Sequence, residues 1–95
     1  MAAYLIASLK QVIDQAGFER YGAQVGPTMR PYGGRLLAGG PGEHIEGDGR
    51  AKMTFLIEFP SMDALHRWYE SEEYREPKVL RLRSADFDLL FIDGA

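Results

Sequence analysis

The sequence predicts a small α+β domain of ferredoxin-like type, in which two strand–helix–strand halves build one four-stranded antiparallel sheet. Three observations predict this class. The 95 residues are enough for one domain, so we expect 1–95 to be a single domain. Each half shows an apolar strand pattern, then a helical periodicity, then a second strand pattern. No low-complexity segment or long linker separates the two halves.

The first half opens with a strand and continues into a helix. Residues 3–10 are predicted to be a strand from their length and apolar content. Asp14 is the expected N-cap, because its carboxylate can accept from the free amides of the first turn. We expect a kink or a one-turn break at Gly26–Pro27, since proline cannot donate to the helical ladder. Spacings of three and four define one helical face, formed by Phe18, Tyr21, Val25, Met29 and Tyr32.

Two further strands are expected between the helical segments. Gly33 and Gly34 are predicted to end the first helix, and 35–38 to form a short strand. Residues 51–59 are the clearest strand of the chain, and Pro60 ends it. Its apolar residues alternate with other side chains, at Met53, Phe55, Ile57 and Phe59.

The second half is predicted to contain a divided helix and a last strand. Ser61 is the expected N-cap, with Asp63 favourably placed in the first turn. Pro77 is expected to separate this helix from a short second one, because proline interrupts the hydrogen-bond ladder. Residues 87–92 form the final strand. The inward face of the first helical piece is expected to consist of Met62, Leu65, Trp68 and Tyr69.

The strands 3–10 and 87–92 are apolar on both faces, which predicts a homodimer. The predicted helices are too few to cover more than one face of a four-stranded sheet. The other face would expose large side chains, at a cost of about 25 cal/mol per Å². Packing two bare sheet faces together with two-fold symmetry removes that exposure. The alternative is a monomer with a partly solvated apolar face.

Composition excludes several classes of site. The net charge is −3 and the Lys and Arg residues are scattered, which argues against nucleic acid as a partner. The absence of cysteine excludes disulfides, Cys-based zinc sites and thiol nucleophiles. No apolar run approaches the roughly 20 residues of a membrane span, and residues 1–8 lack the basic pattern expected of a secretory signal. We therefore expect a cytoplasmic protein that is not associated with a membrane.

Short motifs along nearly the whole chain resemble the domain-of-unknown-function 1330 (DUF1330) family, within the wider dimeric α/β-barrel group. Each motif alone is weak, but their order and spacing together are specific. The resemblance implies a βαββαβ fold and a dimer in which two sheets pair face to face as a dimeric α/β barrel. It implies no assigned reaction, because the fold hosts varied chemistry. The motifs are Ala3-Tyr4-Leu5-Ile6, Tyr32-Gly33-Gly34-Arg35, Glu46-Gly47-Asp48, Glu58-Phe59-Pro60-Ser61, Trp68-Tyr69-x-Ser71, Tyr74 and Leu80-Arg81.

Tyr74 and Arg81 are the strongest candidates for a binding site. They are seven residues apart, so on a continuous helix they would share a face. A guanidinium and a phenol in one cleft suit a carboxylate or an enolate. The alternative is a structural salt bridge from Arg81 to an acid such as Glu73 or Asp86. The predicted substrate-binding residues are Tyr32, Trp68, Tyr74 and Arg81, with aromatic side chains as walls.

Other polar residues are weaker candidates. His44 and Glu46 would lie on one side of an extended segment, but two ligands do not make a metal site. We expect no metal and no organic cofactor. His66 is expected to be a solvated helix residue. Glu58 is either a buried general base or an ion-pair partner at an edge or interface. The glycine-rich segment 39–42 lacks the lysine of a phosphate loop and is expected to be a turn.

Two functions stay open from sequence alone. The first is a small-molecule site between sheet and helices for a small acidic or aromatic compound, with Arg81 as the anion anchor. Any reaction there would use proton transfer by Tyr, His or Glu without a cofactor. The second is a non-catalytic dimerisation or binding module. The sequence does not decide whether the protein is an enzyme.

Overall fold

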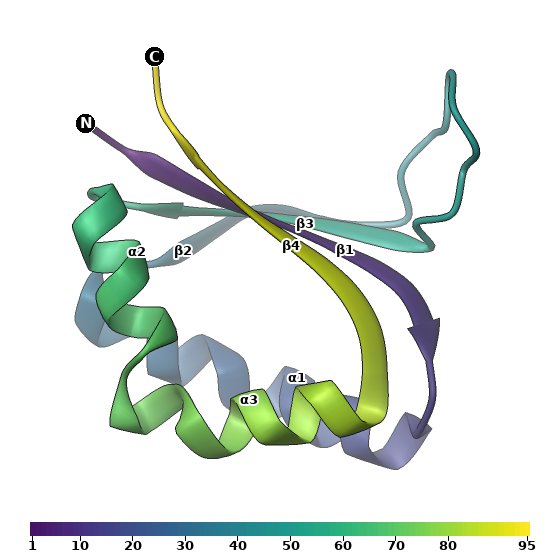
Figure 1. Cartoon of the computed structure of the whole chain (residues 1–95), viewed down its shortest axis with the longest axis horizontal. Coiled ribbons are helices and arrows are strands. Elements are labelled where there is room, and N and C mark those ends of the chain that lie inside the picture. Colours follow the sequence, from purple (N-terminus) through teal and green to yellow (C-terminus); the bar gives the residue numbers. More distant parts are fainter.

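The computed structural model describes residues 1–95 and shows an α+β fold with one sheet and three α-helices (Figure 1). The strands are β1 (Ala3–Val12), β2 (Arg35–Gly40), β3 (Met53–Phe59) and β4 (Ala85–Asp93). The helices are α1 (Gln15–Met29), α2 (Met62–Tyr69) and α3 (Glu72–Ser84), and a 3₁₀ turn, η1 (Arg30–Tyr32), follows α1. None of the helices is long and apolar enough to cross a membrane.

The four strands form an antiparallel sheet in the order β2-β3-β1-β4. The predicted α+β class with a four-stranded antiparallel sheet is confirmed. β1 is central, because it pairs with β3 on one side and with β4 on the other. All three helices lie on one side of the sheet (Figure 1), so the opposite face carries no helix of this chain. We call that opposite face the open face.

The first half follows the sequence prediction except at Pro27. Asp14 caps α1, and its carboxylate accepts from a first-turn amide at 3.3 Å. The helix runs through Pro27 without a one-turn break, which was one of the two alternatives expected there, and the helix geometry changes to 3₁₀ at η1. Gly33 ends η1 with φ at +78°, a conformation that glycine adopts without strain. A side chain at Gly33 would also collide with the ring of Pro60.

The prediction that Pro77 separates two helices is wrong. The chain turns at Glu70, and α3 begins after Ser71, whose hydroxyl accepts from the Tyr74 amide at 3.2 Å. Pro77 lies buried inside α3. Ser71 decides the boundary because its side chain satisfies one of the free first-turn amides, which favours a new helix start at that point. Ser61 caps α2 in the same way, as predicted, by accepting from the Ala64 amide.

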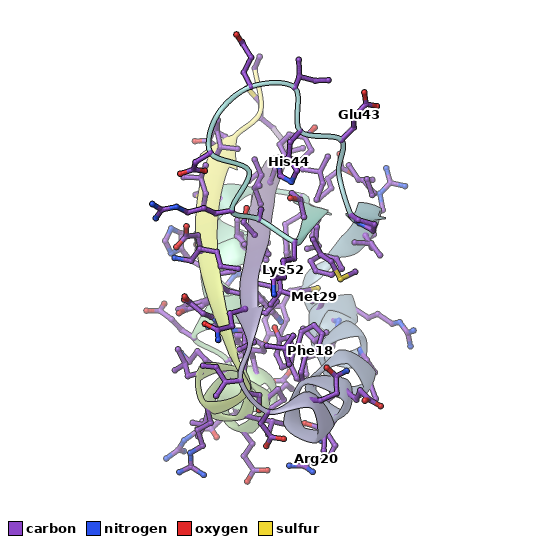
Figure 2. The ribbon with its side chains drawn as sticks, turned by 90° about the vertical axis from the view of Figure 1, so that its right-hand side faces the viewer. Phe18, Arg20, Met29, Glu43, His44 and Lys52 are labelled. Carbon is purple, nitrogen blue, oxygen red and sulfur yellow. The ribbon has the colours of Figure 1, made fainter.

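The core lies between the helices and the sheet. Figure 2 shows Phe18 and Met29 directed from α1 into this layer, while Arg20 points away from it. Trp68 of α2 is fully buried, and its indole nitrogen donates to the Thr28 hydroxyl at 3.0 Å. This bond ties α2 to the end of α1. The largest fully buried side chains are Trp68, Tyr74, Phe59 and Leu65.

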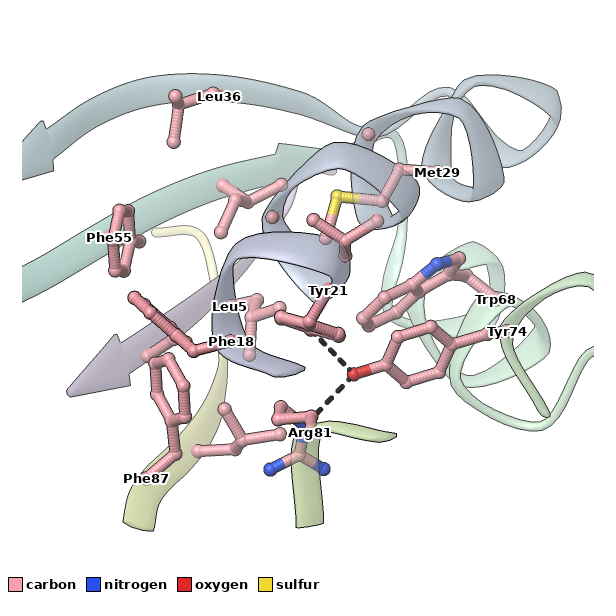
Figure 3. Close-up of a pocket in the computed structure, with 16 residues that line it drawn as sticks. Leu5, Phe18, Tyr21, Met29, Leu36, Phe55, Trp68, Tyr74, Arg81 and Phe87 are labelled. Atoms are coloured by element: carbon pink, nitrogen blue, oxygen red, sulfur yellow. Dashed lines mark hydrogen bonds between the residues drawn. The ribbon is translucent and has the colours of Figure 1, made fainter. Parts of the chain in front are cut away.

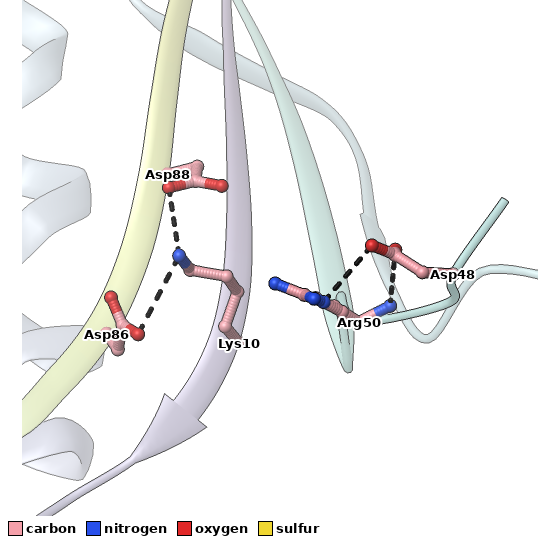
Figure 4. A network of polar contacts seen from close by, with 5 residues as sticks. All are labelled: Lys10, Asp48, Arg50, Asp86 and Asp88. Carbon is pink, nitrogen blue, oxygen red and sulfur yellow. Dashed lines mark hydrogen bonds and ion pairs between the residues drawn. The ribbon is translucent and has the colours of Figure 1, made fainter.

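The open face combines apolar side chains with charged ones. Leu90 and Ile92 of β4 are 56% and 48% exposed, which is high for side chains of this size. At the other end of the sheet the Lys10 ammonium lies 3.2 Å from Asp88 and 3.7 Å from Asp86 (Figure 4). The hydrogen bond to Asp88 is the main cause that raises the pKa of Lys10. The apolar part of the face is therefore bounded by exposed charges.

The β2–β3 connection, 41–52, projects beyond the end of the sheet (Figure 1). Figure 2 shows Glu43 and His44 on this projection. A His44 ring nitrogen lies 2.8 Å from the Ala51 carbonyl oxygen, which links the two arms of the loop. Arg50 pairs with Asp48 within the same loop at 3.1 Å (Figure 4).

Candidate functional site

A cavity of about 290 Å³ lies between the helices and the sheet (Figure 3). Its size is at the lower end of the range of small-molecule pockets, about 300–1,000 Å³. Of the 16 residues that line it, 13 are hydrophobic, and none is Asp, Glu or His. The aromatic side chains in its wall are Phe18, Tyr21, Phe55, Trp68, Tyr74 and Phe87.

The cavity exists partly because two lining positions of α1 carry no side chain. Gly22 and Gly26 both line it, one helical turn apart. Apart from the adjoining residues and the helix's own backbone, no heavy atom lies within 4 Å of the position that a Cβ would take at either residue. Two glycines inside a helix cost roughly 1 kcal/mol each relative to alanine. The helix thus carries a penalty at the two positions where side chains would narrow the space.

One end of the cavity is polar and is formed by Arg81, Tyr74 and Tyr21 (Figure 3). The Arg81 Nε donates to the Tyr74 hydroxyl oxygen at 3.1 Å. The Tyr74 and Tyr21 oxygens lie 2.8 Å apart and share a hydrogen bond. Arg81 is only 4% exposed. We call these three side chains the polar triad.

Arg81 has no carboxylate partner, although sequence analysis left a structural salt bridge open. No ion pair within 4.0 Å includes its guanidinium. Glu73, one of the two expected partners, instead accepts from the Tyr32 hydroxyl at 3.2 Å. Asp86, the other, lies beside Lys10. A structural salt bridge to either acid is therefore absent, and the buried guanidinium has phenols for neighbours.

Burial controls the protonation of the triad. The pKa of Tyr21 is raised far above its ordinary value, chiefly by burial. Burial also raises the pKa of Tyr74, against the lowering effects of its bonds to Tyr21 and Arg81. For Arg81, burial lowers the pKa, while the neighbouring phenols raise it by more. At neutral pH the triad therefore consists of two neutral phenols and one guanidinium cation.

The structure brings three of the four predicted binding residues to the cavity. Trp68, Tyr74 and Arg81 line it, and the seven-residue spacing of the last two aligns them because α3 continues through Pro77. Tyr32 does not line it, since its hydroxyl donates to Glu73 at the surface.

Tyr21 belongs to the polar triad but was assigned only to an apolar helical face by its spacing. It contacts Tyr74 from another helix, 53 residues away in the chain. No local sequence pattern indicates that contact. The one available signal was chemical, a hydroxyl group on a mainly apolar face, and Tyr32 on the same face carries one as well.

The remaining polar candidates lie outside the cavity. Glu58 accepts from the Arg35 Nε at 2.9 Å as an ion pair on the open face. His66 is exposed, and its ring lies edge-on to Phe91 at 5.3 Å. His44 bonds a backbone carbonyl of its own loop. No group of three or more His, Asp and Glu side chains is arranged to hold a metal ion.

Comparison with known proteins identifies a family and a fold. The family model described as domain of unknown function (DUF1330) matches residues 2–95. No curated protein matches the chain.

Solved structures share the fold at low sequence identity. A protein of unknown function from Rhodopseudomonas palustris is 18% identical with a TM-score of 0.80, over 99% of this chain and 82% of that one. A dimeric ferredoxin-like protein of unknown function from Jannaschia sp. CCS1 is 13% identical, with a TM-score of 0.69 over 99% of this chain and 100% of that one. SnoaB, a cofactor-independent oxygenase from Streptomyces nogalater, is 9% identical, with a TM-score of 0.68 over 99% of this chain and 92% of that one.

Proposed function

We propose that this chain, which belongs to the DUF1330 family, binds a small acidic or aromatic molecule in the cavity beside Arg81. The observation that carries the proposal is a buried guanidinium with no carboxylate partner at the end of an apolar cavity. A buried charge without a counter-charge is costly, and an anionic ligand would supply that counter-charge. The aromatic walls would contact the apolar part of the ligand.

Binding is better supported than a reaction. The cavity lining contains no Asp, Glu or His, so proton transfer would depend on Tyr21 and Tyr74. Both phenols have raised pKa values, which makes them poor bases at neutral pH. SnoaB is described as a cofactor-independent oxygenase. A cofactor-free reaction in this chain would need a ligand that itself ionises readily, because neither phenol can act as an effective base. We accordingly propose a binding site in a single domain, 1–95, without metal or organic cofactor.

We also propose that the chain is a homodimer whose subunits meet through their open faces. The apolar residues of this face include Ile6, Leu56, Leu90 and Ile92. Covering them with the same face of a second subunit would remove them from water with closed symmetry. The Jannaschia protein of the same fold is described as dimeric, which supports the proposal.

The dimer is tested by measuring mass in solution by light scattering. Leu90→Lys places a charge in the proposed interface and is expected to give monomers. Leu82→Lys is the matched control, because Leu82 is 63% exposed on α3, which lies on the other side of the sheet from the open face. A wild type that is monomeric at every concentration would contradict the dimer.

A second candidate function is a dimerisation module that binds no small molecule. The open apolar face favours it, since that surface alone explains a dimer. In this case the cavity would have no ligand, and Arg81 would serve only to position Tyr74.

A thermal-shift screen separates the two functions. Wild type, Arg81→Ala and the exposed control Arg83→Ala are compared against small carboxylates and phenols. A ligand present at 100 times its Kd stabilises the native state by about 2.7 kcal/mol. We expect such a shift for wild type and Arg83→Ala only. No shift with any compound, together with a strongly destabilised Arg81→Ala, would favour the dimerisation module.

A further inference from the structure

The polar triad has more hydrogen-bond donors than acceptors. Tyr21 and Tyr74 together carry two hydroxyl protons, and the bond between their oxygens uses one. The other has no acceptor on the protein, because neither oxygen has a further bond in which it donates. One phenol proton is therefore free to bind a ligand.

Arg81 adds further donors at the same end. A guanidinium has five N–H groups and no acceptor. Only the Nε–H is used within the protein, in its bond to Tyr74. The terminal nitrogens make no hydrogen bond to any side chain or backbone atom. Arg81 itself lines the cavity, and its guanidinium carbon lies 6.0 Å from the ring centroid of Phe87, another lining residue.

The lining offers a ligand few acceptors to match these donors. Its only side-chain oxygens are those of Tyr21 and Tyr74, and the bond from Arg81 and the bond between the phenols already use one acceptor position each. A ligand head group that carries its own N–H or O–H would find only a phenol oxygen as its partner, in place of a carboxylate or a carbonyl. Such a mismatch weakens binding by about 5- to 150-fold.

We propose that the ligand is a monocarboxylate with an apolar body, held with its carboxylate against the terminal nitrogens of Arg81 and the free phenol proton of the Tyr21–Tyr74 pair. A carboxylate accepts at both oxygens and donates nothing, so it matches an end that is rich in donors. The rest of the cavity is apolar, so a second charge on the ligand would be buried without a partner. This inference rests on the proposed function of the cavity and goes beyond it by excluding neutral amides, phenols and dianions.

The experiment uses the single tryptophan as its reporter. Trp68 is fully buried in the cavity wall, so its fluorescence responds to a ligand in contact with it. Three probes of similar size are titrated into the wild-type protein: phenylacetate, phenylacetamide and phenylmalonate. They present one carboxylate, its neutral amide counterpart and two carboxylates on the same apolar body. We expect phenylacetate to bind at least about tenfold more tightly than either of the other two.

Variants test which side chains bind the carboxylate. Tyr21→Phe leaves Tyr74 with a hydroxyl proton that no longer has Tyr21 as its acceptor, so one donor stays free and phenylacetate should still bind. Replacing both Tyr21 and Tyr74 with phenylalanine removes that donor, so phenylacetate should bind about tenfold more weakly. Arg81→Gln should abolish the preference for phenylacetate over its amide. Arg83→Gln, an exposed position on the same helix, should leave all three affinities unchanged.

Each outcome has a distinct meaning. If phenylacetamide binds as tightly as phenylacetate to wild type, the carboxylate class is wrong while a small-molecule site remains. If phenylmalonate binds more tightly than phenylacetate, the restriction to one charge is wrong. If none of the probes changes the Trp68 signal or the melting temperature, the proposed function fails and this inference fails with it.

Discussion

Replacing Arg81 with methionine should make the ligand-free protein more stable. Arg81 is 4% exposed and has no carboxylate partner, so the desolvation of its charge, effectively several kcal/mol for a fully buried ion, is not offset by an ion pair. Against this, the substitution removes the bond from Nε to Tyr74, a charged hydrogen bond that contributes about 1.5–3 kcal/mol. Tyr74 keeps its bond to Tyr21, so no buried oxygen loses its last partner.

The net change expected for Arg81→Met is an increase in the free energy of unfolding of about 1–3 kcal/mol, within the range found when buried ion pairs are replaced by apolar residues. For a domain of this size each kcal/mol raises Tm by about 4–8 °C. The same variant should lose all binding of phenylacetate. Stability and binding would then move in opposite directions at a single residue, as expected for a side chain retained for function.

The assay is urea unfolding followed by Trp68 fluorescence, at one fixed protomer concentration because dimerisation is linked to folding. Arg83→Met is the control and should change the unfolding free energy by no more than about 0.5 kcal/mol. The m-value should stay constant, so that a higher midpoint means higher stability. A clear loss of stability in Arg81→Met would refute the reasoning and show that the guanidinium supports the fold.

Three further predictions concern the cavity wall and its supports. Gly22→Leu should raise Tm, because it removes a helix penalty of about 1 kcal/mol, and should weaken phenylacetate binding by narrowing the cavity; stronger binding would contradict this. Thr28→Val should lower the unfolding free energy by about 1–3 kcal/mol, since the buried Trp68 indole N–H loses its acceptor, and an unchanged urea midpoint would count against that bond. Native Tyr21 keeps a proton that the unfolded chain loses above about pH 10. The contribution of Tyr21 to the free energy of unfolding is therefore full below that pH and falls above it by about 1.4 kcal/mol per pH unit. Urea titrations at alkaline pH should show a shallower loss of stability with rising pH for Tyr21→Phe than for wild type.

The strands and helix caps could be predicted because their signals are local. Asp14 and Ser61 cap helices where their side chains can reach first-turn amides, and the alternation in β3 needs only period two. The predicted helix boundary at Pro77 was wrong, because the lack of an amide donor at proline does not end this helix and the start signal lies earlier, at Ser71. Ser71 is followed by two glutamates in the first turn of α3, and this pattern favours a helix start there.

Only the part of the site that lies on a single helix, α3, could be predicted from the sequence. Tyr74 and Arg81 share a face of α3, so their contact follows from a spacing of seven on a continuous helix. Tyr21 joins them across the packing of α1 against α3, which no spacing within either helix encodes. Tyr32 does not line the cavity because it lies in the 3₁₀ turn η1, which has three residues per turn, so the α-helical spacing from Met29 does not hold there.

The pairing of β1 with β4 has a consequence for how the protein folds. Leu5 pairs with Phe91 and Ala7 with Leu89, so one wall of the cavity joins segments that are far apart in the sequence. Contacts of such long range close late and slowly in folding, after local helices and turns have formed. A ligand can bind only after this closure, so it should slow unfolding without accelerating folding. Its main effect on the protein would then be to lengthen the lifetime of the native state.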